Sequence, residues 1–246
     1  MLSQNGLEHL QSAQRVMVLT GAGVSAESGV PTFRGEEGLW KKFRPEELAN
    51  FDAFIRNPKL VWEWYNFRKQ IIAGIEPNPG HYVLAKMESM FPQFTLTTQN
   101  VDGLHRRAGS NNIFELHGNI MCNRCLQCET ITESVELDSV GEVPHCQCGG
   151  MLRPDVVWFG EMLPQGVLSA AMTAAENCDF FFSVGTSAVV YPAASLPVIA
   201  KQSGAYLVEI NPEATPLSYL ADESLCGLSG VILPMILNDL EARRTS

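Results

Sequence analysis

The sequence predicts an α/β fold: a doubly wound, Rossmann-like parallel sheet with a smaller zinc-binding lobe inserted into it. Three observations support this prediction. Short apolar runs alternate with helical tracts, a glycine turn follows the first run, and five cysteines lie within 27 residues. Alternation of strands and helices is typical of parallel sheets, because each crossover between parallel strands needs a long connection. The 246 residues suffice for one large core that carries a smaller module.

The expected strands are short apolar runs, and the expected helices are longer tracts of helix-forming residues. Strands are predicted at 16–20, 94–98, about 113–116, 178–184 and 205–210. Helices are predicted within 51–73, with a break at Pro58, and at 81–88, 165–176, 193–202 and 231–242. We expect a single domain, 1–246, with a core of approximately 1–33, 76–118 and 154–246. The small lobe would comprise approximately 34–75 and a zinc module at 119–153.

The charge balance argues against nucleic acid and membranes as partners. Lys and Arg number 17 and Asp and Glu 27, so the formal net charge is −10. An acidic surface is repelled by phosphate backbones and anionic lipids, and it suits basic, lysine-bearing peptides. The sequence has no run of signal-peptide or transmembrane character, so we expect a cytoplasmic enzyme.

The seven cysteines divide into a cluster of five and two scattered ones, Cys178 and Cys226. We expect those two to be buried small apolar residues, because their surroundings are apolar. Two closely spaced cysteine pairs are typical of a structural zinc site with four thiolate ligands and no open position. Cys146 and Cys148 form one pair. Spacing alone leaves the other open, because Cys122 and Cys128 both lie three residues from Cys125.

A glycine turn after the first strand is suited to a dinucleotide. Gly21 to Ala26 fits G-x-G-x-x-G/A, in which glycines let the backbone approach a pyrophosphate at a helix N-terminus. No acidic residue ends a second strand about 20 residues later, as dehydrogenases require. Asn211, at the end of another strand, is the candidate ribose contact. The simpler interpretation is a structural strand-to-helix turn.

Polar residues follow two further strands. Gln99, Asn100 and Asp102 come after one strand and offer donors and acceptors for a carboxamide or for ribose hydroxyls. A loop of Asx turns is the alternative. His117 ends the next strand, and its near-neutral pKa suits a general base. A histidine in isolation is more often structural than catalytic.

Six segments, in the same order, resemble the sirtuin family of NAD-dependent protein deacylases. They are GAGVSAESGVPTFRG (21–35), TQNVDGLHRRAG (98–109), ELHGN (115–119), RPDVVWFGE (153–161), GTS (185–187) and INPE (210–213). The resemblance covers nearly the whole chain. It implies that NAD is consumed as a co-substrate while acyl groups leave protein lysines, yielding nicotinamide and O-acyl-ADP-ribose. The acyl oxygen would attack the ribose carbon as nicotinamide leaves, giving an alkylimidate.

The resemblance also implies residue roles. His117 would deprotonate a ribose hydroxyl, Asn100 and Asp102 would act with it, and Phe33 would shield the reacting carbon while Arg34 stabilises the loop and the phosphates. The implied NAD-binding residues are Gly21, Ala22, Gly23, Ser25, Glu27, Phe33, Arg34, Gln99, Asn100, Val101, Asp102, Gly185, Thr186, Ser187, Asn211, Pro212, Glu213 and Ser229. Because the family places its first zinc ligand eight residues after the histidine, the implied ligands are Cys125, Cys128, Cys146 and Cys148.

A possible acyl pocket lies in the helix predicted after Pro58. Tyr65 and Arg68, spaced i, i+3, share one helix face and can grip a carboxylate. A surface arginine over an aromatic face is the simpler interpretation. The pair resembles the class III, desuccinylase and demalonylase branch of bacterial type, and Ala49 matches the small residue that leaves room for a longer acyl chain. The residues expected to clamp the peptide as an added strand are Val157, Phe159, Gly160 and Glu161.

Two alternative functions remain at this stage. A mono-ADP-ribosyltransferase would use the same NAD site and move ADP-ribose to protein. A non-catalytic, NAD-sensing zinc scaffold would need no base at position 117. The presence of His117 and of the pocket pair favours a deacylase.

Overall fold

A computed structural model describes residues 1–30, 48–133 and 143–244. Its main element is a six-stranded parallel sheet with the strand order β3-β2-β1-β7-β8-β9. The strands are β1 (Arg15–Thr20), β2 (Gln93–Thr98), β3 (Ile113–Glu115), β7 (Phe180–Val184), β8 (Tyr206–Asn211) and β9 (Glu223–Cys226). The strand order reverses between β1 and β7, so this is a doubly wound sheet. The predicted fold class is confirmed.

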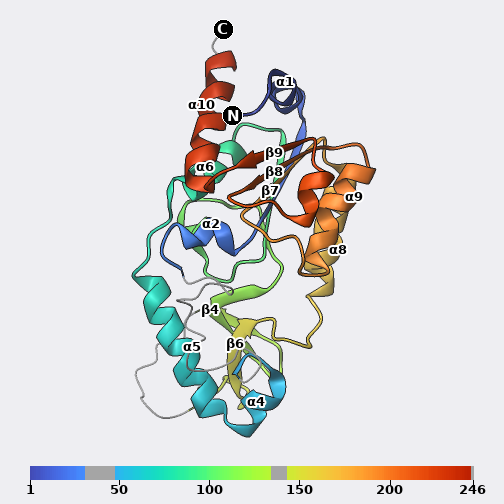
Figure 1. Ribbon diagram of the computed structural model, residues 1–246. Helices are drawn as coiled ribbons and strands as arrows, with labels where there is room; N and C mark the ends of the chain where they lie inside the picture. The colour runs from blue at the N-terminus through green and yellow to red at the C-terminus, as the bar shows by residue number, and fades with distance from the viewer. Residues whose placement is uncertain (31–47, 134–142, 245–246) are drawn as a thin grey trace.

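Helices cover both faces of this sheet (Figure 1). On one face lie α1 (Gln4–Ser12), α6 (Pro79–Glu88) and α10 (Ser229–Arg244). On the other lie α8 (Gln165–Asn177), the short 3-10 helix η2 (Ala193–Ser195) and α9 (Leu196–Gln202). The two helical layers explain why the central strands are apolar on both sides.

Strand β7 shows how one short sequence serves both layers. Phe180 and Phe182 pack into the cluster under α6 and α10, whereas Phe181 packs into the cluster under α8 and α9. All three side chains are fully buried. The alternation arises because successive side chains of a strand point to opposite faces of the sheet. Strand β7 is therefore buried between the two helical layers.

A smaller lobe lies beyond the carboxyl ends of the parallel strands (Figure 1). Its helices are α4 (Phe51–Arg56) and α5 (Pro58–Ala73), and its antiparallel sheet has the order β5-β4-β6. The strands of this sheet are β4 (Gly118–Cys125), β5 (Ile131–Glu133) and β6 (Leu152–Val156). The predicted break at Pro58 is confirmed: Asn57 ends α4 and caps α5, and its side chain accepts a hydrogen bond from the Leu60 amide at 3.2 Å. The domain boundaries given above remain predictions.

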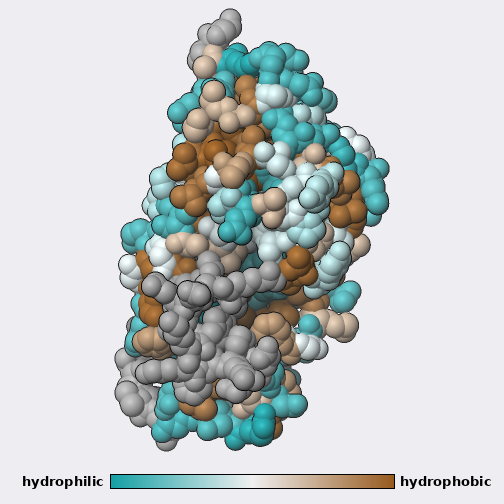
Figure 2. Space-filling view, in the orientation of Figure 1, coloured by the Kyte–Doolittle hydropathy of each residue, from teal (hydrophilic) through white to brown (hydrophobic). Residues whose placement is uncertain are grey.

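Three short helices complete the described chain: α2 (Ala22–Ala26), α7 (Leu104–Arg107) and the 3-10 helix η3 (Pro216–Tyr219). None of the described helices is long and apolar enough to cross a membrane. Hydrophobic surface is visible over the region where α6 and α10 lie together (Figure 2), and Tyr82, Val231 and Met235 are exposed there.

One expectation about the cysteines is wrong. Cys178 is buried as predicted, but Cys226 is exposed. Cys226 ends β9, the edge strand of the sheet, whose residues alternate between partly buried and exposed. Leu225 packs against the core, whereas the exposed Cys226 thiol donates to the Pro212 carbonyl.

Because β7 is central, shortening Phe181 should be costly. We expect Phe181→Ala to lower the free energy of unfolding by about 3–5 kcal/mol, the usual cost of removing a buried aromatic side chain. Urea denaturation followed by circular dichroism measures this. Tyr219→Ala, at a side chain that is 96% exposed, is the control and should have little effect. Equal effects at both positions would contradict the central placement of β7.

Candidate active site and metal centre

The glycine turn and the loop after β7 are in backbone contact. The Gly23 amide donates to the Gly185 carbonyl at 2.8 Å, and the Gly21 amide donates to the Val184 carbonyl at 3.0 Å. A Cβ at Gly23 would lie 2.8 Å from the Gly185 Cα, and a Cβ at Gly21 would lie 2.8 Å from the Gly185 carbonyl oxygen. Gly185 itself has a φ of 58°. Side chains are therefore excluded from this crossing, and backbone amides are brought to the edge of the sheet where such folds bind nucleotides.

The polar loop after β2 lies against this crossing. The Asn100 side chain donates to the Gly21 carbonyl and to Ser25 Oγ, both at 3.0 Å. The Gln99 side chain donates to Thr186 Oγ1 at 2.9 Å. The three loops that follow β1, β2 and β7 are thus joined by side-chain amides. The structure thus brings Gln99, Asn100, Ser25 and Thr186 together.

Asp102 is buried at the centre of this cluster and is only 4% exposed. Burial raises the pKa of its carboxyl group, whereas hydrogen bonds from the Leu104 amide and Ser25 lower it. The Leu104 amide donates to Asp102 Oδ1 at 2.9 Å. A carboxylate held in this way can accept a hydrogen bond from a ligand amide or hydroxyl.

His117 follows β3 and has a fixed tautomer. Its Nδ1 lies 2.8 Å from the Gln99 carbonyl oxygen, and because a carbonyl can only accept, Nδ1 carries the proton. Nε2 is then the basic nitrogen. Burial lowers the pKa of His117, and the bond to the Gln99 carbonyl partly opposes that shift. The imidazole is therefore neutral, and able to accept a proton, over the physiological pH range.

Two further histidines lie in the core behind the loop and were not predicted as part of the site. His105 Nε2 lies 2.9 Å from Thr20 Oγ1, and His81 Nε2 lies 3.5 Å from Ser25 Oγ. Their rings are 4.7 Å apart. Burial lowers the pKa of His81 to about 4 and that of His105 to about 3. Both are neutral and support the hydroxyl groups beneath Asn100; their sequence positions within helices carry no signal of this.

The remaining predicted NAD residues lie at other points of the same edge. Asn211 ends β8, and its side chain donates to the Glu213 carbonyl at 2.7 Å. Glu27 accepts a hydrogen bond from Ser229 Oγ at 2.5 Å and joins α2 to the start of α10. Pro212 and Glu213 are exposed. Phe33 and Arg34 lie outside the described residues.

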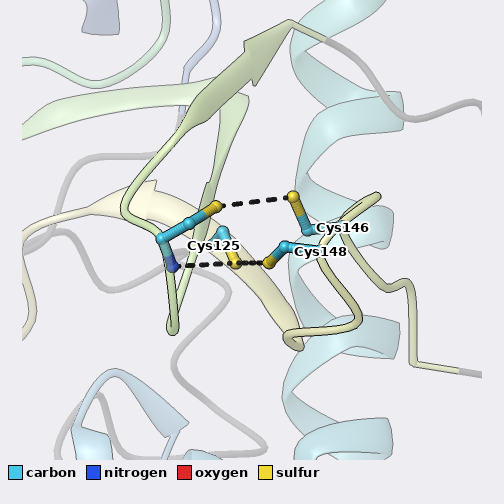
Figure 3. A group of neighbouring side chains, drawn as sticks. Cys125, Cys146 and Cys148 are labelled. Atoms are coloured by element: carbon cyan, nitrogen blue, oxygen red, sulfur yellow. Dashed lines mark hydrogen bonds between the residues drawn. The ribbon is translucent and has the colours of Figure 1, made fainter.

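Four of the five clustered cysteines converge. The Sγ atoms of Cys125, Cys128, Cys146 and Cys148 all lie within 4.8 Å of one another. Cys146 and Cys148 come from one loop and face Cys125 at the end of β4 (Figure 3). Cys125 and Cys148 Sγ are 3.5 Å apart, and Cys128 and Cys146 Sγ are 3.7 Å apart.

These distances suit a zinc ion. Tetrahedral thiolates at a Zn–S distance of about 2.3 Å lie about 3.8 Å from one another. The amides of Gln127 and Cys128 donate to Cys125 Sγ at 3.4 and 3.5 Å, which supports a thiolate. Cys122 pairs with Glu133 across the small sheet and takes no part in the cluster. The four-cysteine cluster fits a structural zinc site with all four positions filled by protein.

The predicted acyl pair lies on the inner face of α5. The Tyr65 side chain is fully buried, and the guanidinium carbon of Arg68 lies 5.5 Å from the centre of its ring. Burial lowers the pKa of Arg68, and the charges of Tyr65 and Asp102 oppose that shift. The guanidinium carbon also lies 4.7 Å from the centre of the Trp64 ring. Arg68 is therefore a half-buried arginine that lies over the aromatic face of α5.

The segment after β6, residues 157–161, forms a strap between His117 and the small lobe. The Val157 amide donates to the His117 carbonyl at 2.9 Å, and the Phe159 amide donates to the Ala49 carbonyl at 3.0 Å. Glu161 forms a two-pronged ion pair with Arg153, which is 7% exposed. The predicted residues of the strap therefore link His117 to the small lobe. Gly160 has a φ of 87° and forms the turn between Phe159 and Glu161.

Comparison with known proteins agrees with this geometry. The model of the Sir2 family matches residues 21–192. The chain belongs to the Sir2 family.

Relatives within the Sir2 family match over most of their length. An NAD-dependent protein deacylase of Aquifex aeolicus is 57% identical over 210 residues, which cover 84% of this chain and 87% of that protein. NAD-dependent protein deacylase 2 of Pyrobaculum aerophilum is 50% identical and covers 97% and 96%. A solved Sir2 homologue in complex with NAD superimposes with a TM-score of 0.92 at 45% identity, over 99% of this chain and 95% of that one.

Within this Sir2 family site, the sequence analysis gave no individual role to Arg153 or Trp158. Arg153 precedes the stretch predicted to clamp the peptide and Trp158 lies within it, and both are buried. The sequence does not indicate that Arg153 and Trp158, five positions apart, are in contact. They meet only because the strap folds back. The guanidinium carbon of Arg153 lies 3.4 Å from the centre of the Trp158 ring.

The zinc assignment predicts which cysteines matter. Purified protein should carry about one zinc per chain, and Cys125→Ala or Cys148→Ala should lose it and unfold the small lobe, since metal binding and folding are linked. Elemental analysis and circular dichroism measure the two effects.

Cys122→Ala is the matched control and should retain zinc. Loss of zinc from Cys122→Ala together with its retention in Cys128→Ala would show that the other CxxC pair binds the metal.

Proposed function

We propose that this Sir2 family protein is a cytoplasmic NAD-dependent deacylase that removes acetyl, succinyl and malonyl groups from protein lysines. The observation that carries the proposal is the fixed tautomer of His117. Its Nδ1 is held by the Gln99 carbonyl, so Nε2 is the nitrogen that can accept a proton, beside the loop whose Gln99 side chain bonds to Thr186. A base in that place serves a reaction at a ribose hydroxyl.

The known relatives support this function. The two relatives described above, which are 57% and 50% identical to this chain, are both named as NAD-dependent protein deacylases. One solved Sir2 structure, 35% identical with a TM-score of 0.84, holds a deacetylated peptide with 3'-O-acetyl-ADP-ribose. An acylated lysine is therefore the substrate class, and NAD is the co-substrate.

Each residue of the proposed site has a role that suits its chemical groups. The absence of side chains at the glycine crossing would let the pyrophosphate approach the backbone, and Asn211 lies where the adenosine ribose would be held. Asn100 and Asp102 orient the nicotinamide ribose, and His117 takes a proton from one of its hydroxyls. The strap residues from Val157 to Glu161 would hold the peptide as an added strand through their carbonyl groups, because the Val157 and Phe159 amides already bond to the His117 and Ala49 carbonyls. The zinc ion, with no open position, stabilises the small lobe and does no chemistry.

The acyl group is proposed from the pocket on α5. Arg68 and Tyr65 can give a buried carboxylate charge-assisted hydrogen bonds, which an acetyl group cannot use. Ala49 beside the strap leaves room for a longer chain. These features support the class III branch, with succinyl- and malonyl-lysine as substrates.

The rival functions have less support. A non-catalytic scaffold would not need a base with a fixed tautomer. A mono-ADP-ribosyltransferase would not need an arginine and a tyrosine that together bind an acid. The cytoplasmic location is proposed because clustered cysteines that suit a metal are typical of reducing compartments, where disulfides are rare.

The role of His117 is tested by removing the base. His117→Ala should lower kcat for deacylation by about 10²–10⁴-fold, the usual contribution of a general base, while the melting temperature and zinc content stay unchanged. Release of free lysine peptide, followed by mass spectrometry, measures the rate. His9→Ala, at an exposed histidine, is the control. Near-normal turnover of His117→Ala would rule out this role.

The same residue predicts the pH profile. His117 must be neutral to accept a proton, and its pKa lies below the ordinary 6.5 because it is buried. The value of kcat/KM should therefore stay high as pH falls to 6.5 and decline only below it. A decline centred above pH 6.5 would contradict a buried, neutral base.

Substrate choice is tested at Arg68. Arg68→Met should lower kcat/KM for a succinyl-lysine peptide by about 100-fold, the scale for breaking a desolvated charge pair, and leave an acetyl-lysine peptide far less affected. Arg56→Met on α4, where the exposed guanidinium bonds only the Asp52 carbonyl among the described residues, is the control. Equal losses on both substrates from Arg68→Met would mean that Arg68 only supports the lobe.

A further inference from the structure

The hydroxyl of Tyr65 has a buried partner that the sequence analysis did not assign. Trp158 Nε1 lies 2.8 Å from the Tyr65 hydroxyl oxygen. The Tyr65 side chain is fully buried and Trp158 is 2% exposed, so water does not compete for this bond. Tyr65 comes from α5 and Trp158 from the strap after β6. The bond therefore joins the two walls of the proposed acyl pocket.

The direction of this hydrogen bond is fixed by chemistry. An indole nitrogen can only donate, so the phenol oxygen of Tyr65 must accept. The hydroxyl proton of Tyr65 is then left for a different partner, and the described residues offer it no acceptor. Burial raises the pKa of Tyr65, so the group keeps this proton at neutral pH. A hydroxyl that already accepts one hydrogen bond is also a stronger donor of its own proton.

The indole that sets this direction is itself held from three sides. Arg153 lies over its ring, the Phe54 ring centre is 5.3 Å away, and the Trp158 backbone amide donates to Glu161 Oε2 at 2.8 Å. Because Glu161 is also ion-paired with Arg153, the carboxylate and the guanidinium lock both the backbone and the ring of Trp158. An indole held so firmly is suited to orient a second group.

We infer that Trp158 is a positioning residue for acyl specificity: its N–H fixes the Tyr65 hydroxyl as a proton donor to the carboxylate of an acidic acyl group. The inference rests on the proposed function, because it needs an acyl carboxylate beside Arg68. Arg68 supplies the charge, and Trp158 acts through Tyr65 to supply an oriented neutral donor. An acetyl group has no carboxylate to receive that proton, so Trp158 should matter for acidic acyl groups alone.

The test is Trp158→Phe, which keeps an aromatic ring and removes the N–H. We expect KM for a succinyl-lysine peptide to rise about tenfold with kcat nearly unchanged, the scale of one oriented hydrogen bond to a charged group. The acetyl-lysine peptide should change less than about twofold. The ratio of the two substrates is measured within one sample, so it does not depend on how much of the variant is folded.

The chain offers a matched control. Trp62 is another buried indole of the small lobe, and its Nε1 donates to the Leu152 carbonyl at 3.0 Å. Trp62→Phe removes a buried N–H of the same kind, but from a bond to the backbone. It should lower the melting temperature and leave the succinyl-to-acetyl ratio unchanged.

A double-mutant cycle tests whether Trp158 acts through Tyr65. In a Tyr65→Phe background, Trp158→Phe should change the substrate ratio less than about twofold, because the group to be oriented is gone. Effects that multiply independently would overturn the inference, as would equal losses on both substrates from Trp158→Phe alone. If Arg68→Met is selective and Trp158→Phe is not, the inference fails and the proposed function stands. If Arg68→Met is also unselective, the proposed substrate class fails with it.

Discussion

The structure depends on the backbone contact between the loop after β1 and the loop after β7, where no side chain lies between the two chains. Gly21 and Gly23 after β1 and Gly185 after β7 approach so closely that a methyl group on any of them would collide with the opposite backbone. This contact lies where the strand order of the sheet reverses. Because no side chain intervenes, backbone amides and carbonyls form the edge, and the amide side chain of Asn100 can bond to Gly21 directly. That bond helps to hold the polar loop after β2, together with the bonds from Asn100 to Ser25 and from Gln99 to Thr186.

A second constraint joins the small lobe to this edge. The four cysteines hold the ends of β4 and the loop before β6, and β6 leads into the strap that carries Trp158. Arg107, just after the catalytic loop, donates to the carbonyls of Ile72 and Ile75 at the end of α5. The proposed acyl pocket thus lies between two elements, α5 and the strap, that are each bonded to other parts of the proposed site. Zinc binding, although it takes no part in the proposed reaction, can therefore affect how well the proposed acyl pocket is formed.

Much of this arrangement could be predicted from the sequence because the signals are local. Strands such as Phe180–Val184 are continuous apolar runs, and the glycine turn and the spaced cysteines have few other structural meanings. Spacing alone did not choose between Cys122 and Cys128; the family resemblance did, and the fold brings Cys128 to the cluster.

The parts that could not be predicted depend on contacts between distant segments. Trp158 and Tyr65 are 93 positions apart, and nothing near either residue indicates that they share a hydrogen bond. His81 lies in a predicted helix, but the contacts of His81 with Ser25 and of His105 with Thr20 follow only from the packing of α6 and α7 beside β1. Cys226 was expected to be buried from its apolar neighbours, whereas an edge strand turns alternate residues outward.

The most direct test of the account is the product balance of one reaction. The unaltered protein is incubated with NAD and a succinyl-lysine peptide, and all products are measured by mass spectrometry. The account predicts one nicotinamide and one succinyl-ADP-ribose for each lysine freed, and no reaction without NAD. A peptide that gains the mass of ADP-ribose and keeps its succinyl group, or a lysine freed without loss of NAD, would contradict it.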